Sequence, residues 1–181
     1  MKLNVYKIDA FTKKISGGNS ACVIPLKSWL RDDLLLSISK DNAVTETAFF
    51  ILKDDKILLR WFTPNIEMDL CGHATLATAH CLNSILKHPN NSIKFETKSG
   101  KINVDFKDDK YHMDFPSRVP TKYELPKIIS KSLNLQPLEV YKSRDFLLLY
   151  NSEEDIKKIK IDTFYFNQIN LDPGGIVAVS Y

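Results

Sequence analysis

The segment from Gly72 to Leu86 constrains the fold most, because it has helical character but no charged face. Most of its side chains are small, with Leu76 and Leu82 between them. A helix on a protein surface normally carries a polar face, so a helix without one is expected to be surrounded by other structure. Small side chains also let neighbouring backbone come close. We therefore predict that a sheet wraps around this helix.

Short apolar or alternating runs on both sides of this helix predict the strands of such a sheet. The expected strands are 3–8, 21–24, 47–52 and 57–62 before the helix, and 93–97, 102–106 and 111–115 after it. Pro25 is expected to end the second strand, because proline cannot donate a ladder hydrogen bond. Asp32 or Asp33 is expected to cap a further helix over residues 34–40. A polar turn at residues 53–56 joins the third and fourth strands.

A boundary is predicted near residue 116, where Pro116, Pro120 and Pro126 interrupt the pattern of strands. The sequence thus divides into residues 1–115 and residues 116–181. The second part predicts a helix at 127–133, a hairpin of 139–142 with 146–150, a helix opened by Ser152 with Asp155 three residues on, and a strand at 176–180. It offers few large apolar residues for a core of its own, and it stops at Tyr181 directly after an apolar strand. We expect an unfinished second half.

The composition of the chain excludes several classes of function. The 25 basic and 22 acidic residues leave a net charge of +3, too balanced to indicate a nucleic-acid partner. No run approaches the roughly 20 apolar residues of a membrane helix, and the N-terminus does not resemble a signal peptide. The three cysteines are scattered and odd in number, which favours a reducing cytoplasm over a disulfide or zinc framework.

Glu46 is the first candidate for chemistry. In an extended chain it shares a face with Val44, Ala48 and Phe50, while Thr45 points the other way. Burial among apolar neighbours disfavours the charged form of a carboxyl group and raises its pKa, which suits a general acid or base. The alternative is an ordinary carboxylate at a strand end, exposed or capping the backbone. The pattern alone leaves both open.

The second candidate is the start of the apolar helix at Cys71-Gly72-His73. The first turn of a helix has free backbone N–H groups and partial positive charge, and Gly72 lets a ligand carboxylate approach them. His73 is able to donate a hydrogen bond or carry a proton. Taken singly, Gly72 is as well explained as a turn residue and His73 by a local backbone partner. His73 and His80 share a helix face, but no third ligand lies nearby in the sequence, so we predict no metal site.

Cys71 and Asn19 each have two interpretations. Cys71 is either a nucleophile or base activated by the helix start, or a small buried apolar residue, and we favour the second. Asn19, after two glycines, is either a left-handed turn residue or an amide that binds substrate. The turn interpretation is the stronger one on the residues alone.

Several motifs in order resemble one family. They are Asp9-Ala10-Phe11-Thr12, Gly18-Asn19-Ser20-Ala21-Cys22-Val23, Thr45-Glu46-Thr47-Ala48-Phe49, Trp61-Phe62-Thr63-Pro64 and Leu70-Cys71-Gly72-His73-Ala74-Thr75-Leu76-Ala77. In this order and spacing they are similar to the phenazine-biosynthesis (PhzF-like) isomerases, relatives of diaminopimelate epimerase and proline racemase. The resemblance is strong over residues 1 to about 115 and weaker beyond Pro116.

The resemblance implies an α+β fold of two similar halves, each a β-barrel-like sheet around a central helix, with the active site in the cleft between them. It implies a cofactor-free, biosynthetic isomerase that moves a proton on a small carboxylate-bearing substrate. Glu46 matches the general acid/base of the family. Gly72 and His73 match positions that hold the substrate, and Asn19 and Thr45 match residues lining the same pocket. No catalytic role follows for Cys71.

The sequence departs from the family in one respect. Members continue with a Glu-Asp-Pro-Val-Thr-Gly-Ser-Ala-type motif, and the nearest dipeptide here, Asp172-Pro173, lacks the residues that should follow. We therefore expect a truncated isomerase that lacks the second half of its active site and that self-associates through the unfinished half or forms a homodimer. The alternative is a non-catalytic remnant or small-anion-binding module.

Overall fold

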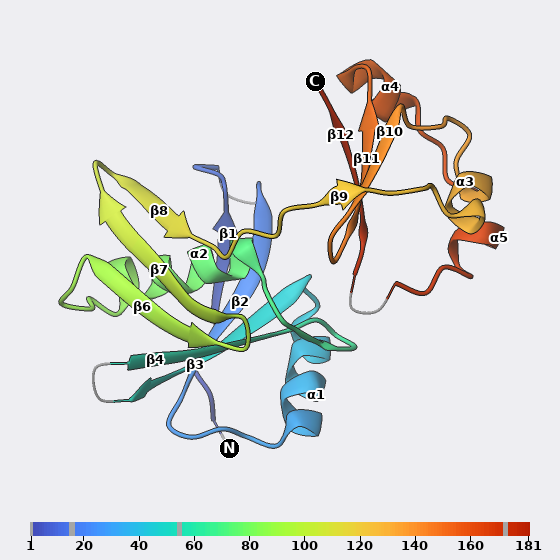
Figure 1. Cartoon of the computed structure of the whole chain (residues 1–181). Helices are drawn as coiled ribbons and strands as arrows, with labels where there is room; N and C mark the ends of the chain where they lie inside the picture. The colour runs from blue at the N-terminus through green and yellow to red at the C-terminus, as the bar shows by residue number, and fades with distance from the viewer. Residues whose placement is uncertain (1, 15–16, 54–55, 172–173) are drawn as a thin grey trace. The chain divides into compact units, whose positions relative to one another are not determined.

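In the computed structural model, the apolar helix α2 (Gly72–His80) lies inside a curled, eight-stranded sheet (Figure 1). The structure describes residues 2–14, 17–53, 56–171 and 174–181. Contacts divide the chain into two compact units, Met1–Pro116 and Ser117–Tyr181, and α2 belongs to the first. Among the described residues, no helix has the length and apolar character needed to cross a membrane.

The sheet of the first unit follows the order β1-β2-β3-β4-β6-β7-β8, with β5 paired to β4. The strands are β1 (Tyr6–Ala10), β2 (Asn19–Leu26), β3 (Glu46–Lys53), β4 (Lys56–Phe62), β5 (Glu67–Met68), β6 (Ser92–Thr97), β7 (Gly100–Lys107) and β8 (Lys110–Asp114). All seven strands predicted for this part are present with shifted ends. The turn predicted at 53–56 has its centre, residues 54–55, outside the described residues.

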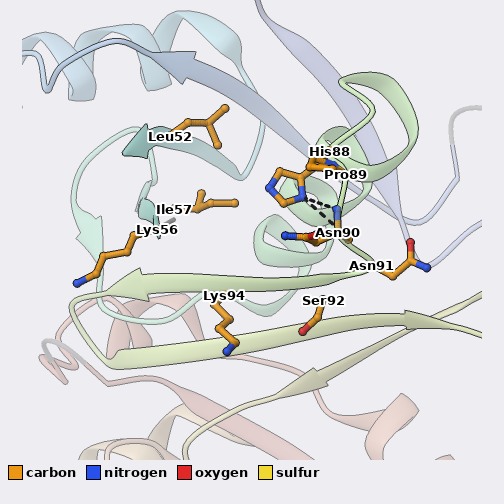
Figure 2. Close-up of a pocket in the computed structure, with 9 residues that line it drawn as sticks. All are labelled: Leu52, Lys56, Ile57, His88, Pro89, Asn90, Asn91, Ser92 and Lys94. Carbon is orange, nitrogen blue, oxygen red and sulfur yellow. Dashed lines mark hydrogen bonds between the residues drawn. The ribbon is translucent and has the colours of Figure 1, made fainter. Parts of the chain in front are cut away.

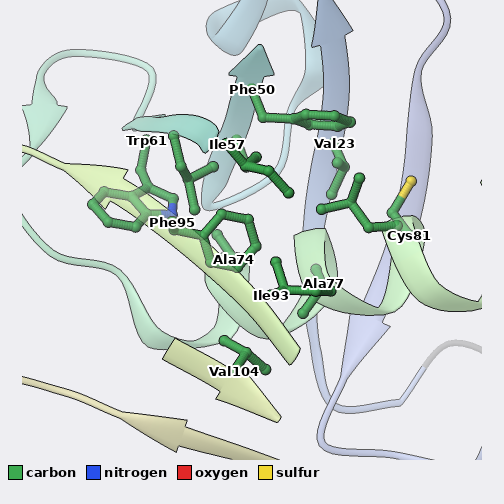
Figure 3. Close-up of a cluster of buried hydrophobic side chains, with 14 of the residues drawn as sticks. Val23, Phe50, Ile57, Trp61, Ala74, Ala77, Cys81, Ile93, Phe95 and Val104 are labelled. Atoms are coloured by element: carbon green, nitrogen blue, oxygen red, sulfur yellow. The ribbon is translucent and has the colours of Figure 1, made fainter. Parts of the chain in front are cut away.

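Small side chains on α2 explain why the sheet can close around it. The buried residues of the helix are alanines and threonines, namely Ala74, Thr75, Ala77, Thr78 and Ala79. The Thr75 hydroxyl donates to the carbonyl of Cys71 at 2.6 Å, and Thr78 donates to Ala74 at 2.7 Å, so neither buried hydroxyl is left without a partner. Figure 3 shows large apolar side chains from the sheet around Ala74 and Ala77. The wrapped-helix prediction is confirmed.

The helix does not continue unchanged to Leu86. After His80 the chain widens into a π-helix, η1 (Cys81–Ile85), in which the N–H of Leu86 bonds to the carbonyl of Cys81 at 2.9 Å. Such a π-helical turn adds a residue to the helical repeat and shifts which side chains share a face. Hydrophobic periodicity over so few residues does not distinguish this geometry from an α-helix.

Two local predictions are wrong. Strand β2 runs through Pro25 instead of ending before it: β1 pairs with β2 only from Asn19 to Val23, so at Pro25 one side of β2 needs no ladder hydrogen bond. Helix α1 (Asp32–Asn42) begins after Arg31, which places Asp32 and Asp33 in the first turn and not at the cap. Their charges there still favour the helix through its dipole.

Strand β3 is buried on both faces. Ala48 and Phe50 belong to the cluster around α2, whereas Phe49 and Ile51 pack in a second cluster with Leu35 of α1. A strand with two buried faces reads as a continuous apolar run, as the sequence from residue 48 to 51 does. This double burial fixes the position of Glu46 at the start of the strand.

The second unit has a four-stranded sheet in the order β12-β11-β10-β9. Its elements are β9 (Thr121–Lys122), α3 (Lys127–Ser132), β10 (Glu139–Lys142), β11 (Phe146–Tyr150), α4 (Glu153–Lys158), α5 (Thr163–Phe166) and β12 (Ile176–Ser180). The predicted cap of α4 is confirmed, since the Ser152 side chain accepts a hydrogen bond from the N–H of Asp155. The dipeptide Asp172-Pro173 lies outside the described residues.

The second unit has a core of its own, although the sequence offers few large apolar residues for one. The buried cluster consists of Ile129, Val140, Phe146, Leu148 and Tyr150, with ten partly buried apolar residues packed against it. Many of these are medium-sized side chains scattered over short elements, so no single apolar run in the sequence predicts this core. A Tyr150 hydroxyl that donates to the carbonyl of Leu135 at 3.1 Å satisfies the polar end of the largest of them.

Gly18 provides a test of the close backbone approach between the end of β1 and the start of β2. Its φ is +64°, and an added Cβ would lie 2.0 Å from the carbonyl oxygen of Ala10. We expect Gly18→Ala to lower the free energy of unfolding by roughly 3 kcal/mol in urea denaturation, because backbone strain and a clash with backbone combine. Gly100→Ala is the matched control: φ is +98° but no atom lies within 4 Å of the added Cβ, so about 1 kcal/mol is expected. Equal losses in both variants would show that the clash at Ala10 is unimportant.

Candidate active site

The fold brings the five predicted site residues to one place at the start of α2. Strands β2 and β3 run parallel, with Ala21 opposite Glu46, so both strands begin at the same edge of the sheet. Asn19 is the first residue of β2, and Glu46 is the first residue of β3. The N-terminus of α2, with Gly72 and His73, meets this edge, as the contacts below show.

His73 is the centre of the cluster. Its Nε2 lies 3.1 Å from Oε2 of Glu46 and 3.3 Å from Oγ1 of Thr45, and its Nδ1 lies 3.5 Å from Sγ of Cys71. The side chains are largely buried, with 10% of His73 and 17% of Glu46 exposed. One imidazole ring therefore joins a carboxylate, a hydroxyl and a thiol.

Thr45 lies on the side of Glu46, which corrects the prediction that the two point in opposite directions. Strand β3 begins at Glu46, so Thr45 sits in the preceding bend, where strand alternation does not apply. Its hydroxyl donates to Oδ1 of Asn19 at 3.2 Å or to the carbonyl of Ser20 at 3.3 Å. Whenever that proton points to Asn19 or Ser20, Oγ1 of Thr45 is able to accept from Nε2 of His73.

Asn19 is a strand residue and not the left-handed turn residue favoured from the sequence. The positive φ falls one residue earlier, on Gly18. Asn19 pairs with Ala10 of β1, and its side chain reaches Thr45. The glycine thus makes the turn, which leaves the amide of Asn19 to face the cluster.

The pKa of Glu46 is lowered, contrary to the prediction that burial raises it. The His73 ring is the main cause, and burial opposes it without overcoming it. Thr45 adds a smaller lowering effect. Within the described residues, Oε2 of Glu46 is buried and has no well-aligned hydrogen-bond donor, so its contact with Nε2 of His73 is an ion pair rather than a hydrogen bond.

His73 shows the complementary change. Hydrogen bonding to Cys71 and then the contact with Glu46 raise the pKa of His73 to about 9, against the effect of burial. The ring is therefore cationic at neutral pH. Burial raises the pKa of the Cys22 thiol and raises that of Cys81 to about 11, as expected of packing residues.

The first turn of α2 is suited to an anion. It carries no acidic side chain, and its cap, Cys71, makes no side-chain hydrogen bond to the helix. Gly72 leaves the backbone open, since an added Cβ would meet only the ring of Phe115 at 3.9 Å. The free N–H groups of the first turn and the cationic ring of His73 together favour a bound carboxylate.

The cluster also contains residue types that bind metals. The ligand atoms of Glu46, Cys71 and His73 lie within 4.8 Å of one another, so the structure supplies the neighbours that the sequence did not reveal. However, Glu46 lies against Nε2 of the ring and Cys71 against Nδ1. The two nitrogens point in different directions, so this ring orientation does not let all three residues bind a single ion. His80 contacts Tyr111 instead of His73.

An ion-pair network that sequence analysis missed holds the loop before α2. Arg60 of β4 donates to both carboxylate oxygens of Glu67 in β5, at 2.7 and 2.9 Å, and Lys98 also pairs with Glu67. The Ser99 hydroxyl donates to the carbonyl of Asp69, two residues after Glu67, at 2.7 Å. These contacts anchor the loop that leads into Cys71. The sequence signal that could have indicated this network is Arg60, a charged residue within the apolar run of β4.

The most voluminous of the described cavities lies elsewhere. Figure 2 shows this hollow of about 750 Å³ near the β3–β4 and η1–β6 connections, with Lys56 and Lys94 among its lining residues. None of its lining residues belongs to the cluster around His73. Its long side chains are exposed, and His88 and Asn90 bond mainly to each other. We place the candidate site at His73 because titratable groups with altered pKa values converge there.

The curled sheet around α2 defines an α+β half-barrel of the diaminopimelate epimerase-like class. The chain belongs to the phenazine biosynthesis-like protein family, whose model matches residues 8–180. The resemblance predicted from the motifs is thereby confirmed.

Several bacterial relatives in the family carry the name isomerase. An uncharacterised isomerase of Pseudomonas aeruginosa is 39% identical over 162 residues, which cover 90% of this chain and 62% of the relative. One of Halalkalibacterium halodurans is 38% identical over 187 residues, covering 99% of this chain and 68% of the relative. The chain therefore spans less than two thirds of the length of the first.

Solved structures agree with the sequence matches. A phenazine biosynthesis PhzF family protein of Enterococcus faecalis superposes with a TM-score of 0.83 at 33% identity, covering 99% of this chain and 70% of that protein. A putative PhzC/PhzF protein of Clostridium difficile gives a TM-score of 0.81 at 34% identity, covering 99% and 69%.

The contacts of His73 with Cys71 and Glu46 predict the pKa at which the His73 ring titrates. Following the ring proton by NMR, we expect a pKa of about 9 in the native protein. Cys71→Ala and Glu46→Gln should each lower it by about one unit. Because folding raises this pKa from 6.5, the stabilisation is complete below pH 6.5 and is lost as the pH rises through about 9.

The matched control is Cys81→Ala, which removes a buried thiol beyond the opposite end of α2 from His73. It should leave the His73 titration unchanged. A His73 pKa near 6.5 in the native protein, or an equal shift in the Cys71 and Cys81 variants, would contradict the described pairing.

Proposed function

We propose that this chain is a cofactor-independent isomerase of the PhzF type, which moves a proton on a small carboxylate-bearing substrate with Glu46 as the general acid/base. The observation that carries the proposal is the 3.1 Å contact between Oε2 of Glu46 and Nε2 of His73 at the open start of α2. Since the chain spans about 62% of the Pseudomonas relatives, the activity of a complete enzyme is part of the proposal.

In the resting site Glu46 is ionised and His73 is cationic, which makes Glu46 the group that accepts the first proton. The substrate carboxylate binds to the free N–H groups of α2 and to the His73 ring. This second anion competes with Glu46 for the positive charge of His73. With that support weakened, burial dominates at Glu46 and raises its pKa toward the range in which a carboxyl group both takes and returns a proton.

The proposed reaction moves one proton from the substrate to Glu46 and back to the same substrate molecule. Glu46 removes a proton from a carbon next to an unsaturated group, and the electron pair of the C–H bond moves into that group. The Glu46 acid then returns the proton to another carbon of the same molecule. No electron is gained or lost, which is why no redox cofactor is needed. Asn19 and Thr45 hold each other in position at the site through the hydrogen bond between their side chains.

The resemblance to the family leads us to expect a second set of substrate contacts, including an aspartate, that is not recognisable in this sequence. The buried, free cysteines support a reducing, cytoplasmic setting for the protein. The alternative function, a carboxylate-binding module without catalysis, uses the same helix start. It differs from the isomerase only in whether Glu46 exchanges a proton with the bound molecule.

The Glu46 role predicts loss of proton exchange in one variant. The chain is incubated in D₂O with a panel of small unsaturated carboxylates, and deuterium incorporation into carbon is followed by NMR. We expect Glu46→Gln to reduce the rate at least ~100-fold, because a general acid/base contributes about 10²–10⁴. Glu96→Gln is the control, since Glu96 pairs with Lys56 and has no part in the cluster.

Unchanged exchange in Glu46→Gln would remove Glu46 from the mechanism. If no carboxylate of the panel exchanges, but binding is seen and His73→Ala abolishes it, the binding-module alternative holds.

A further inference from the structure

The segment that leads into α2 has little secondary structure of its own. Strand β5 supplies only two paired residues, Glu67 opposite Phe62 and Met68 opposite Trp61. In the described part of the chain, residues 69–71 pair with no strand. The path of this loop therefore depends on side-chain contacts, and those contacts bear on where the first turn of α2 lies.

The turn between β6 and β7 supplies two of these contacts, although it lies about 30 residues later in the sequence. The Lys98 ammonium pairs with Glu67, and the Ser99 hydroxyl donates to the carbonyl of Asp69 at 2.7 Å. The turn is itself closed by a hydrogen bond from the N–H of Ser99 to the Thr97 hydroxyl at 3.2 Å. An ordered turn is thus tied to the loop at two points, two residues apart.

Glu67 keeps its charge although its side chain is only 12% exposed. Burial acts to raise the pKa of Glu67, but the hydrogen bonds from Arg60 and Lys98 together lower it. The two cations come from different parts of the sheet, Arg60 from β4 and Lys98 from the turn after β6. A buried carboxylate with two charged partners is a fixed point, because moving it away from either cation would leave its charge poorly compensated.

Cys71 lies between this loop and the helix, and both sides are held. On the helix side, its carbonyl accepts hydrogen bonds from the N–H and the hydroxyl of Thr75, at 3.2 and 2.6 Å. On the loop side, the carbonyl of Asp69 is tied to Ser99. The Cys71 side chain makes no cap hydrogen bond, and its Sγ lies 3.5 Å from Nδ1 of His73. With the helix side fixed, a displacement at Asp69 changes the backbone angles of residues 70–71 and with them this contact.

We propose that Lys98 and Ser99 of the β6–β7 turn are positioning residues, which hold Cys71 against the His73 ring and so hold the ring in place beside Glu46. The inference rests on the proposed function, in which the His73 ring is the partner of Glu46. Both residues act through the loop before α2 and not on a bound molecule. A misplacement of about 1 Å at a reacting group can cost about 10²-fold in rate, so contacts outside the site matter for its chemistry.

The test follows the titration of the His73 ring by NMR in the 181-residue chain, alongside urea denaturation of the same variants. Ser99→Ala removes the hydrogen bond from the turn to the loop, and Lys98→Met removes the ion pair. We expect each variant to lower the pKa of His73 by about half a unit, because Sγ of Cys71 moves away from Nδ1. Ser99→Thr keeps a hydroxyl and should restore the native pKa of about 9.

Ser39→Ala is the matched control, because the Ser39 hydroxyl in α1 also donates to a backbone carbonyl of the first unit, that of Leu35 at 2.9 Å. It should leave the His73 titration unchanged, whatever it does to stability. The titration needs no substrate, so a chain without proton exchange would remove the isomerase proposal and still answer this question. If Ser99→Ala and Lys98→Met lower stability but leave the His73 pKa unchanged, or if Ser39→Ala shifts it equally, the turn only stabilises the fold and the proposal is overturned.

Discussion

The packing of an uncharged, small-residue helix inside a curled sheet is the constraint on which the first unit depends. Because Ala74 and Ala77 have no bulk, the strands of the sheet approach α2 closely and large side chains such as Trp61 and Phe95 fill the space between them (Figure 3). The same packing fixes where the helix begins. Its first turn meets the edge where the parallel strands β2 and β3 start, so the position of the candidate site follows from the core.

At that edge the contacts among Glu46, His73 and Cys71 outweigh burial in setting the pKa values of Glu46 and His73. Burial alone would raise the pKa of Glu46 and lower that of His73, and the reverse is found for both residues. The largest contribution to the raised pKa of His73 comes from the Cys71 thiol, which contacts the opposite nitrogen of the imidazole. A resting site with separated charges is poised to respond to an incoming anion, which changes the partner of His73 and thereby the proton affinity of Glu46.

Sequence patterns predicted the helix, the strands of the first unit and the family, because hydrophobic periodicity and ordered motifs are local signals. They failed where the answer depends on residues distant in sequence. The pKa of Glu46 depends on His73, 27 positions later, and the loop before α2 depends on the pairing of Arg60 with Lys98 through Glu67. The core of the second unit was missed because its apolar residues come from many short elements.

The coupling between Glu46 and His73 is the central claim, and a double-mutant cycle on the free energy of unfolding measures it directly. With Glu46→Gln, His73→Gln and the double variant at pH 7, we predict a coupling of about 1 kcal/mol or more in favour of the native pair. The coupling should fade as the pH rises through about 9, where His73 loses its proton. Additive effects at pH 7, with no coupling, would contradict the ion pair and the proton chemistry that rests on it.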